Sequence, residues 1–305
     1  MPRRLRTATA LRNFALASVL ANVLIVVSGG AVRLTNSGLG CPTWPSCTDS
    51  SLTPTRAYAI HGVIEFTNRQ LTFVLALIAV ATWLVAMARR QERTLATIAA
   101  LSIPAQAVLG GLTVLTHLNP WLVAAHFLFS MSIIFVTFWL WWRVRDAAPP
   151  AALPRAALQL ARLTVLSAAA VLALGTVVTG SGPHAGDLTS GKVHRTGLQV
   201  SSMAQLHADS VMVLVGVSVG LLALLYAVRA SQAVRRASWI LLGVELAQAA
   251  IGYTQYFLHV PPLLVALHML GACLLWLAAL YVLALLEPRV SRIPAPAGRP
   301  LRTAG

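Results

Sequence analysis

Long apolar stretches separated by short polar segments dominate this chain. Each stretch is close to the roughly 20 residues that a helix needs to cross a lipid bilayer. Eight such stretches lie at residues 14–32, 59–86, 95–115, 121–142, 163–180, 197–228, 237–258 and 262–286. The pattern therefore predicts an all-α integral membrane protein with eight transmembrane helices.

Composition agrees with a chain whose main solvent is lipid. Apolar residues make up 57% of the 305 residues and charged residues only 10%, too little polar surface to cover a water-soluble globule of this size. The net charge of +15 is compatible with nucleic acid, but the basic residues form short clusters at the ends of alternate stretches. We therefore expect contact with the lipid bilayer and no nucleic-acid partner.

The basic clusters predict the orientation of the helices. They lie before the first stretch, after the second, fourth and sixth stretches, and in the tail, so that 18 of the 23 basic residues fall on one side. Cytoplasmic loops are the ones enriched in Lys and Arg, so both termini are predicted to be cytoplasmic. The basic start indicates a retained first helix rather than a cleaved signal peptide. The tail at 287–305, rich in Pro and Arg, is predicted to be disordered.

An internal repeat divides the chain into two halves. Residues 106–126 match residues 248–268 at nine of 21 positions without a gap. The matches include residues that are unusual in membrane helices, namely Gln106/Gln248, Gly110/Gly252, His117/His259, Pro120/Pro262 and His126/His268. We predict two four-helix bundles, at 1–145 and 146–286, related by a pseudo-twofold axis along the membrane normal.

Two of the three cysteines, Cys41 and Cys47, lie in the first loop that is predicted to be external. Cys273 stands alone inside the last apolar stretch. External thiols meet an oxidising compartment, so we expect a disulfide between Cys41 and Cys47. Two reduced loop cysteines are the alternative.

Three histidines, His126, His207 and His268, lie inside apolar stretches, where an unpaired imidazole is costly. One interpretation is an interhelical hydrogen bond for each. The other is haem iron, because imidazoles from the second and fourth helices of one bundle, His207 and His268, make an axial pair. Zinc is less favoured, since no external Cys/His cluster of suitable spacing accompanies them. The sequence leaves open the roles of His117, His184, His194 and His259.

A polar stripe runs along the second stretch. Its residues recur at spacings of three and four and so share one helical face: His61, Glu65, Asn68, Arg69 and Thr72. Ionisable residues within a membrane helix favour a functional role. A salt bridge between Glu65 and Arg69, one turn apart, is the structural alternative.

Five segments of the sequence resemble the haem A synthase family. They are GGAVRLTNSGLGCPTWPSC, IEFTNR, NPWLVAAH, AQLHAD and GYTQYF…LLVALHMLGA, and together they span nearly all eight predicted helices. The first segment, with its paired cysteines, is fairly specific. The resemblance implies an oxidoreductase that oxidises a methyl group of haem O, through a hydroxylated intermediate, to the formyl group of haem A.

The resemblance also implies which residues hold two haems. His207 and His268 would ligate a resident haem b in the second half. In the first half, His126 would ligate the substrate haem O. Glu65 matches a residue needed for the reaction, and we expect Asn68 and Arg69 on the same helical face to belong to the catalytic site with it.

The chain departs from the family at Asn68, where many members have histidine. Either the substrate haem is five-coordinate through His126, or it sits nearer the outer face with His61 as second ligand, or the site is degenerate. His61 lies seven residues before Asn68, about 10 Å along the helix axis, and cannot replace it in place. We favour the five-coordinate arrangement, with Asn68 beside the catalytic carboxylate.

The implied setting is a bacterial cell membrane, with the haem sites towards the external side. Haem O synthase and a terminal oxidase are candidate partners, and a second copy of the chain is a further candidate. Two rival functions remain, a di-haem cytochrome b linked to quinol and a proton-coupled transporter.

Overall fold

The chain folds into eight long helices joined by loops. A computed structural model describes residues 7–55, 59–145, 153–187 and 193–287. The helices are α1 (Ala8–Leu34), α2 (Ala59–Arg89), α3 (Arg93–Leu115), α4 (Pro120–Val144), α5 (Arg155–Ser181), α6 (Val200–Ala227), α7 (Gln232–Phe257) and α8 (Pro262–Leu286). Apart from one isolated bridge between Thr48 and Ser51, these described ranges contain no strand. The predicted all-α fold is confirmed, whereas the tail beyond Glu287 lies outside the described residues.

Seven of the eight helices in the described ranges are long and apolar enough to cross a membrane, which makes the chain a multi-pass membrane protein. The exception is α7, which is 26 residues long but carries Glu245 and Gln248 near its middle. Its crossing of the bilayer stays a prediction. Several helices also extend beyond the predicted apolar stretches; α5, for example, begins at Arg155, because backbone hydrogen bonding continues where hydropathy falls.

The internal repeat is also present in the backbone. Both of its turns have left-handed residues with φ between 51° and 62°: His117 and Leu118, and His259 and Val260. The next helix begins in both places with a proline, Pro120 in α4 and Pro262 in α8. Proline suits this position because the first N–H groups of a helix have no partner within it.

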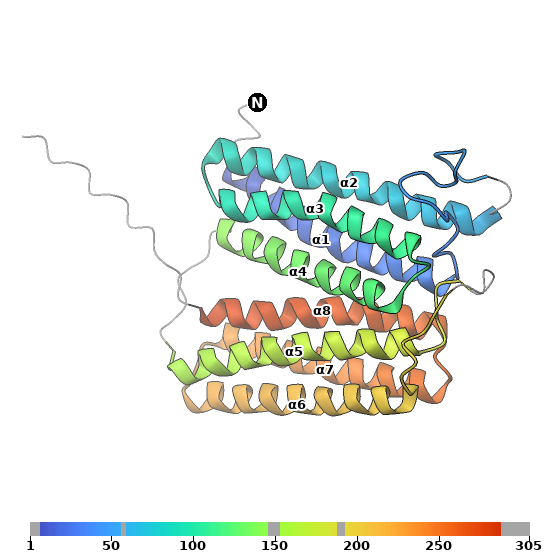
Figure 1. Cartoon of the computed structure of the whole chain (residues 1–305). Coiled ribbons are helices and arrows are strands. Elements are labelled where there is room, and N and C mark those ends of the chain that lie inside the picture. The colour runs from blue at the N-terminus through green and yellow to red at the C-terminus, as the bar shows by residue number, and fades with distance from the viewer. Residues whose placement is uncertain (1–6, 56–58, 146–152, 188–192, 288–305) are drawn as a thin grey trace, which may run out of the picture.

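Contacts between the helices form two rings of four. In the first ring α1 packs on α2, α2 on α3, α3 on α4 and α4 on α1, and α5 to α8 repeat this cycle. The rings meet where α8 contacts α1 and α4, and where α4 contacts α5 (Figure 1). Among the described residues α6 and α8 make no direct helix–helix contact. Long side chains of α6 and α8 can therefore meet across the middle of the second ring.

The junction between the rings is closely packed. One hydrophobic cluster extends across both rings and includes the fully buried Ala157, Ala161 and Ala168 of α5; such small residues let membrane helices approach one another. Trp276 of α8 is also buried, and its indole N–H donates to the backbone carbonyl of Met131 in α4 at 3.0 Å. This hydrogen bond fixes the relative position of α4 and α8.

The rings are also joined at the end of the helices that carries loop residues 35–55 and 182–187, which we call the long-loop end (Figure 1). Arg33, near the end of α1, donates from Nε to the carbonyl of His184 at 2.7 Å and from Nη2 to that of Thr179 at 2.9 Å. The N–H of Gly38 donates to the carbonyl of Gly186 at 2.8 Å. The first loops of the two halves are therefore tied together.

Replacing Trp276 by Ala should destabilise the detergent-solubilised protein by roughly 3–5 kcal/mol, because it leaves a cavity at the junction of the rings. Trp276→Phe keeps most of the packing and should cost only about 1 kcal/mol for the lost hydrogen bond. Thermal unfolding midpoints measure both effects. Trp121→Ala is the control, since Trp121 is 54% exposed. Equal effects of the two alanine variants would contradict the packing assigned to Trp276.

Candidate functional site

A pair of histidines lies in the middle of the second ring. His207 comes from α6 and His268 from α8, two helices whose backbones lie on opposite sides of the ring. Their ring centres are 6.5 Å apart and the ring planes are inclined at 74°. The two imidazoles predicted from sequence to form a pair are thus brought together.

Each imidazole of this pair packs against a glycine of a neighbouring helix. A Cβ placed on Gly175 of α5 would lie 3.2 Å from Cε1 of His207, and one on Gly252 of α7 would lie 3.5 Å from Cε1 of His268. The Nδ1 atoms of both histidines are buried and have no hydrogen-bond partner in the described residues. Buried polar atoms normally have a partner, so this site has capacity for a ligand.

The spacing of the rings fits a metal ion held between them. A metal lies about 2 Å from a coordinating imidazole nitrogen and the ring centre about 1 Å further, which places two axial rings about 6 Å apart. The described residues contain no cluster of three or more His, Cys, Asp or Glu side chains that could hold a bare ion. A metal with only two protein ligands must bring its other ligands with it, as haem iron does. The donor set of the second ring therefore fits haem better than zinc.

The first ring repeats only half of this arrangement. His126 of α4 has a buried Nδ1 without a partner, and a Cβ on Gly110 of α3 would lie 3.0 Å from its Cε1. Gln106 of α3 donates from Nε2 to the carbonyl of His126 at 2.8 Å and to Oγ of Ser130 at 2.6 Å. These contacts hold the turn of α4 that carries the imidazole. Within the described residues no ring contact pairs His126 with a second histidine.

Asn68 and His61, the two residues considered as a second ligand, have other partners. Oδ1 of Asn68 accepts from Oγ of Ser28 in α1 at 2.8 Å. His61 is exposed and its Nδ1 lies 3.0 Å from Oγ of Ser37 in the first loop. Neither residue forms a hydrogen bond with His126 in the described part of the chain. Their shared face on α2 could be predicted from sequence, but their partners Ser28 and Ser37 could not.

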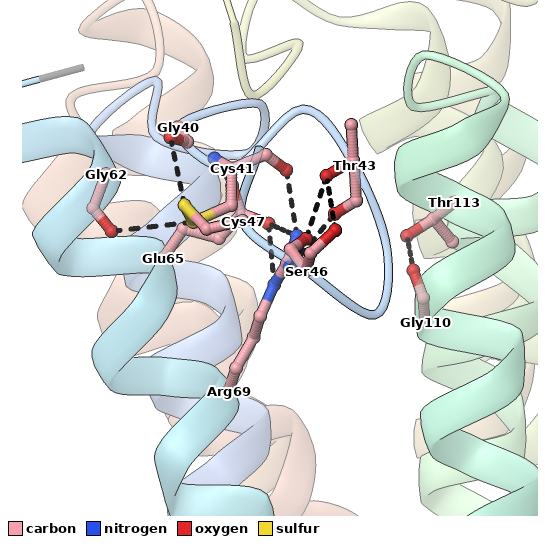
Figure 2. Close-up of polar contacts among 10 residues, drawn as sticks. All are labelled: Gly40, Cys41, Thr43, Ser46, Cys47, Gly62, Glu65, Arg69, Gly110 and Thr113. Carbon is pink, nitrogen blue, oxygen red and sulfur yellow. Dashed lines mark hydrogen bonds and ion pairs between the residues drawn. A yellow bond between two sulfur atoms is a disulfide. The ribbon is translucent and has the colours of Figure 1, made fainter. Parts of the chain in front are cut away.

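Glu65 and Arg69 form the salt bridge that the sequence offered as the structural alternative, with Nη2 of Arg69 2.6 Å from Oε1 of Glu65. Glu65 is only 5% exposed, and its other oxygen, Oε2, accepts from the backbone N–H of Cys41 at 2.6 Å. Arg69 also donates to three backbone carbonyls of the same loop, those of Cys41, Thr43 and Ser46, at 2.8 to 3.1 Å (Figure 2). The ion pair therefore anchors the loop to α2.

The anchored loop is closed by the predicted disulfide between Cys41 and Cys47, which the structure confirms. Gly40 packs on the backbone of His61 at the start of α2, and the indole of Trp44 lies against Gly111 of α3. Both positions are too close for a side chain at the glycine. The loop thus covers the long-loop end of α2 and α3.

Other polar residues of the second half also have hydrogen-bond partners. Oε1 of Glu245 accepts from Oγ of Ser218 in α6 at 2.7 Å, and Nε2 of Gln205 donates to Oδ1 of Asp209 at 2.7 Å. Nε2 of His184 donates to the carbonyl of Val260 at 2.8 Å. Three further histidines are exposed in loops: His117, His194 and His259.

Sequence reasoning missed the glycines that face the imidazoles. Gly110 and Gly252 are matched positions of the internal repeat, so the repeat did contain a signal for them. Nothing in the sequence distinguished Gly175. The role of Arg33 in joining the two halves was missed as well, because its partners, the carbonyls of Thr179 and His184, are distant in the chain.

Arg69→Gln should loosen the loop, since it removes the ion pair with Glu65 and up to three charge-assisted hydrogen bonds to loop carbonyls. Each such bond contributes about 1.5–3 kcal/mol. The Cys41–Cys47 disulfide of the folded protein should then be reduced by a phosphine at least about tenfold faster, as followed by thiol labelling and mass spectrometry. Arg89→Gln, at the other end of α2, is the control. An unchanged reduction rate in Arg69→Gln would show that Arg69 does not hold the loop.

Comparison with known proteins identifies relatives for parts of the chain. Heme A synthase of Geobacillus thermodenitrificans is 35% identical over 121 residues, which is 38% of this chain and 37% of the relative. Heme A synthase of Lysinibacillus sphaericus (strain C3-41) is 33% identical over 126 residues, 40% of each chain. Heme A synthase of Listeria welshimeri is 32% identical over 130 residues, 41% of each chain. The matched region therefore spans about two-fifths of the length of these curated relatives.

A family model covers far more of the chain. The model described as "Cytochrome oxidase assembly protein" matches residues 12–280, a range that includes part or all of each of the eight helices. It therefore includes both rings and every histidine described above. The chain belongs to this cytochrome oxidase assembly protein family, COX15-CtaA.

Proposed function

We propose that this chain is a haem A synthase, an oxidoreductase that converts a methyl group of haem O to the formyl group of haem A through a hydroxylated intermediate. The observation that carries the proposal is the pair of imidazoles from His207 and His268, 6.5 Å apart in a member of this family. The partial matches to curated proteins named Heme A synthase support it.

The proposal includes a pseudo-twofold arrangement of two four-helix bundles. The two rings of helix contacts, the matching turns and the sequence repeat support it. The distribution of Arg supports a cytoplasmic location of both termini. In this topology α7 crosses the bacterial cell membrane, and the long-loop end lies on its external side. The Cys41–Cys47 disulfide agrees with that side, because an oxidising compartment favours it.

In this proposal the second bundle holds haem b through His207 and His268. When bound, haem b supplies an iron that accepts and releases single electrons. Gly175 and Gly252 leave room for each imidazole, and their helices restrict how the rings turn.

The first bundle would bind haem O, with His126 as the protein ligand. The hydrogen bond from Ser28 to Asn68 and the contact between His61 and Ser37 leave His126 without a second imidazole, which supports the five-coordinate alternative. An open position suits a substrate that must react and leave better than a closed bis-histidine site.

Glu65 would act on water in this scheme. Arg69 and the N–H of Cys41 favour an ionised carboxylate that keeps a fixed position. Such a carboxylate can orient water or take its proton as the water oxygen bonds to the oxidised methyl carbon. Supply of haem O and use of haem A make haem O synthase and a terminal oxidase the expected partners.

A di-haem cytochrome b is the second candidate, because His207, His268 and His126 would also suit an electron carrier. The two functions differ in the pigments of the purified protein. A synthase should contain haem b together with haem O or haem A, whereas a carrier should contain haem b alone. A spectrum without a Soret band would exclude both and favour a transporter.

Glu65→Gln keeps the shape of the side chain and removes its charge. Haem O or its hydroxylated derivative should accumulate and haem A should fall at least about 100-fold, because general-base catalysis commonly contributes that much. Acid–acetone extraction followed by liquid chromatography measures the pigments. Haem b content should stay unchanged, which shows that the variant folds.

Glu245→Gln is the control for this experiment, because Glu245 is also a buried carboxylate but lies in the other half. Its haem A content should stay near that of the unmodified chain. Unchanged haem A in Glu65→Gln would refute the catalytic role of Glu65.

His207→Ala and His268→Ala should each lower the haem b content roughly tenfold or more, since both ligands are needed to hold the iron. His126→Ala should keep haem b and lose the copurified haem O. Absorption spectra and extracted pigments of the purified variants measure this. His259→Ala, an exposed loop histidine, should change neither. Loss of haem b in His126→Ala alone would reverse the assignment of the two halves.

A further inference from the structure

A groove lies on the surface between α6 and α7 near the long-loop end. No residue of the salt bridges or of the histidine sites described above lines it. It is shallow and open to the surroundings, with a volume of about 520 Å³. It is lined by Ser201, Ser202, Gln205, Leu206, Asp209 and Tyr256.

The groove combines polar and apolar side chains, and its polar groups lie next to an apolar stretch of α6. Gln205 and Asp209 are one turn apart on α6 and both are exposed, whereas the next exposed residues along the helix are Met212 and Val213. A hydrogen bond from Gln205 satisfies only Oδ1 of Asp209. The hydroxyl of Tyr256, a residue that is 53% exposed, has no hydrogen-bond partner among the described residues. Polar groups facing lipid are costly, so these side chains have capacity for a ligand that hydrogen-bonds within the membrane.

The groove and His207 are on opposite sides of the same turn of α6. Asp209 and Gln205 are each two residues from His207, so they point away from the imidazole pair, towards the surface. A helix with its side chains is about 10 Å across, which separates a molecule in the groove from the imidazole by about that distance. An electron acceptor in the groove would therefore be close to the metal site without entering the bundle.

We propose that this groove binds a quinone, which accepts the electrons that leave the haem b site. This inference rests on the proposed function and names its electron acceptor. A quinone is a flat apolar ring with two carbonyl oxygens and a tail that stays in lipid. The phenol of Tyr256 and the amide of Gln205 can donate to those oxygens, and Leu206 can contact the ring. Asp209 can pass on the protons that reduction requires.

The electron and proton balance closes with this acceptor. Converting the methyl carbon of haem O to a hydroxymethyl carbon consumes one water and releases two electrons and two protons. Converting the hydroxymethyl carbon to the formyl carbon releases two more of each. These four electrons and four protons reduce two quinones to two quinols. Overall, the methyl group of haem O, one water and two quinones give the formyl group of haem A and two quinols.

The test is reoxidation of haem b in the purified, full-length protein. After chemical reduction and removal of the reductant under anaerobic conditions, a short-chain quinone such as decylubiquinone should restore the oxidised spectrum. Asp209→Asn and Tyr256→Phe should each slow this reaction about tenfold, with haem b content and spectrum unchanged. Tyr253→Phe, an exposed tyrosine one turn before Tyr256 that does not line the groove, should react like the unmodified protein.

A second measurement keeps this test separate from the proposed function. An azidoquinone, activated by light, should label peptides of α6 and α7, and unlabelled quinone should suppress the labelling. This readout does not need haem. Labelling of other peptides would overturn the assignment of the groove as a quinone site. Equal reoxidation rates in Asp209→Asn, Tyr256→Phe and the unmodified protein would overturn it as well. The proposed function fails instead if the extracted pigments lack haem O and haem A while labelling of the groove persists.

Discussion

The absence of water from the bilayer core is the constraint on which this structure depends, because every polar group there must find a partner in the protein or in a ligand. Glu65, Arg69 and Asn68 find theirs in the first loop and in α1. The Nδ1 atoms of His207 and His268 do not. Other buried polar atoms of the described residues also lack a partner, among them Oε2 of Glu245 and Nε1 of Trp139, so the histidines stand out by their pairing and not by this feature alone.

The sequence predicted the helices well because apolar length is a local property, and it predicted Cys41–Cys47 because the two residues are close in the chain. It could not predict that Arg69 binds the carbonyls of that loop, since this depends on how the loop folds back over α2. The salt bridge with Glu65, considered as an alternative to function, is present and serves the loop. In α7 the sequence underestimates a helix that is present in the structure, because polar residues lower the mean hydropathy of the segment.

The repeat explains why two different sites can share one scaffold. Gly110 and His126 in the first ring correspond to Gly252 and His268 in the second, and in both places an imidazole packs over a glycine. The helices α2 and α6, each the second of its ring, differ instead. α6 supplies a second imidazole, whereas α2 supplies a carboxylate held in place by a guanidinium. This difference between α2 and α6 is the basis for proposing a resident haem in the second half and the substrate in the first.

The junction between the rings determines how the two sites can cooperate. The histidines of the repeat are on α4 and α8, and these helices contact each other directly. The hydrogen bond from Trp276 to the carbonyl of Met131 holds them in register, and Arg33 joins the loops above them. In the proposed function electrons would pass between the two sites, and because electron transfer depends steeply on distance, a rigid contact between the two histidine-bearing helices would keep that path short.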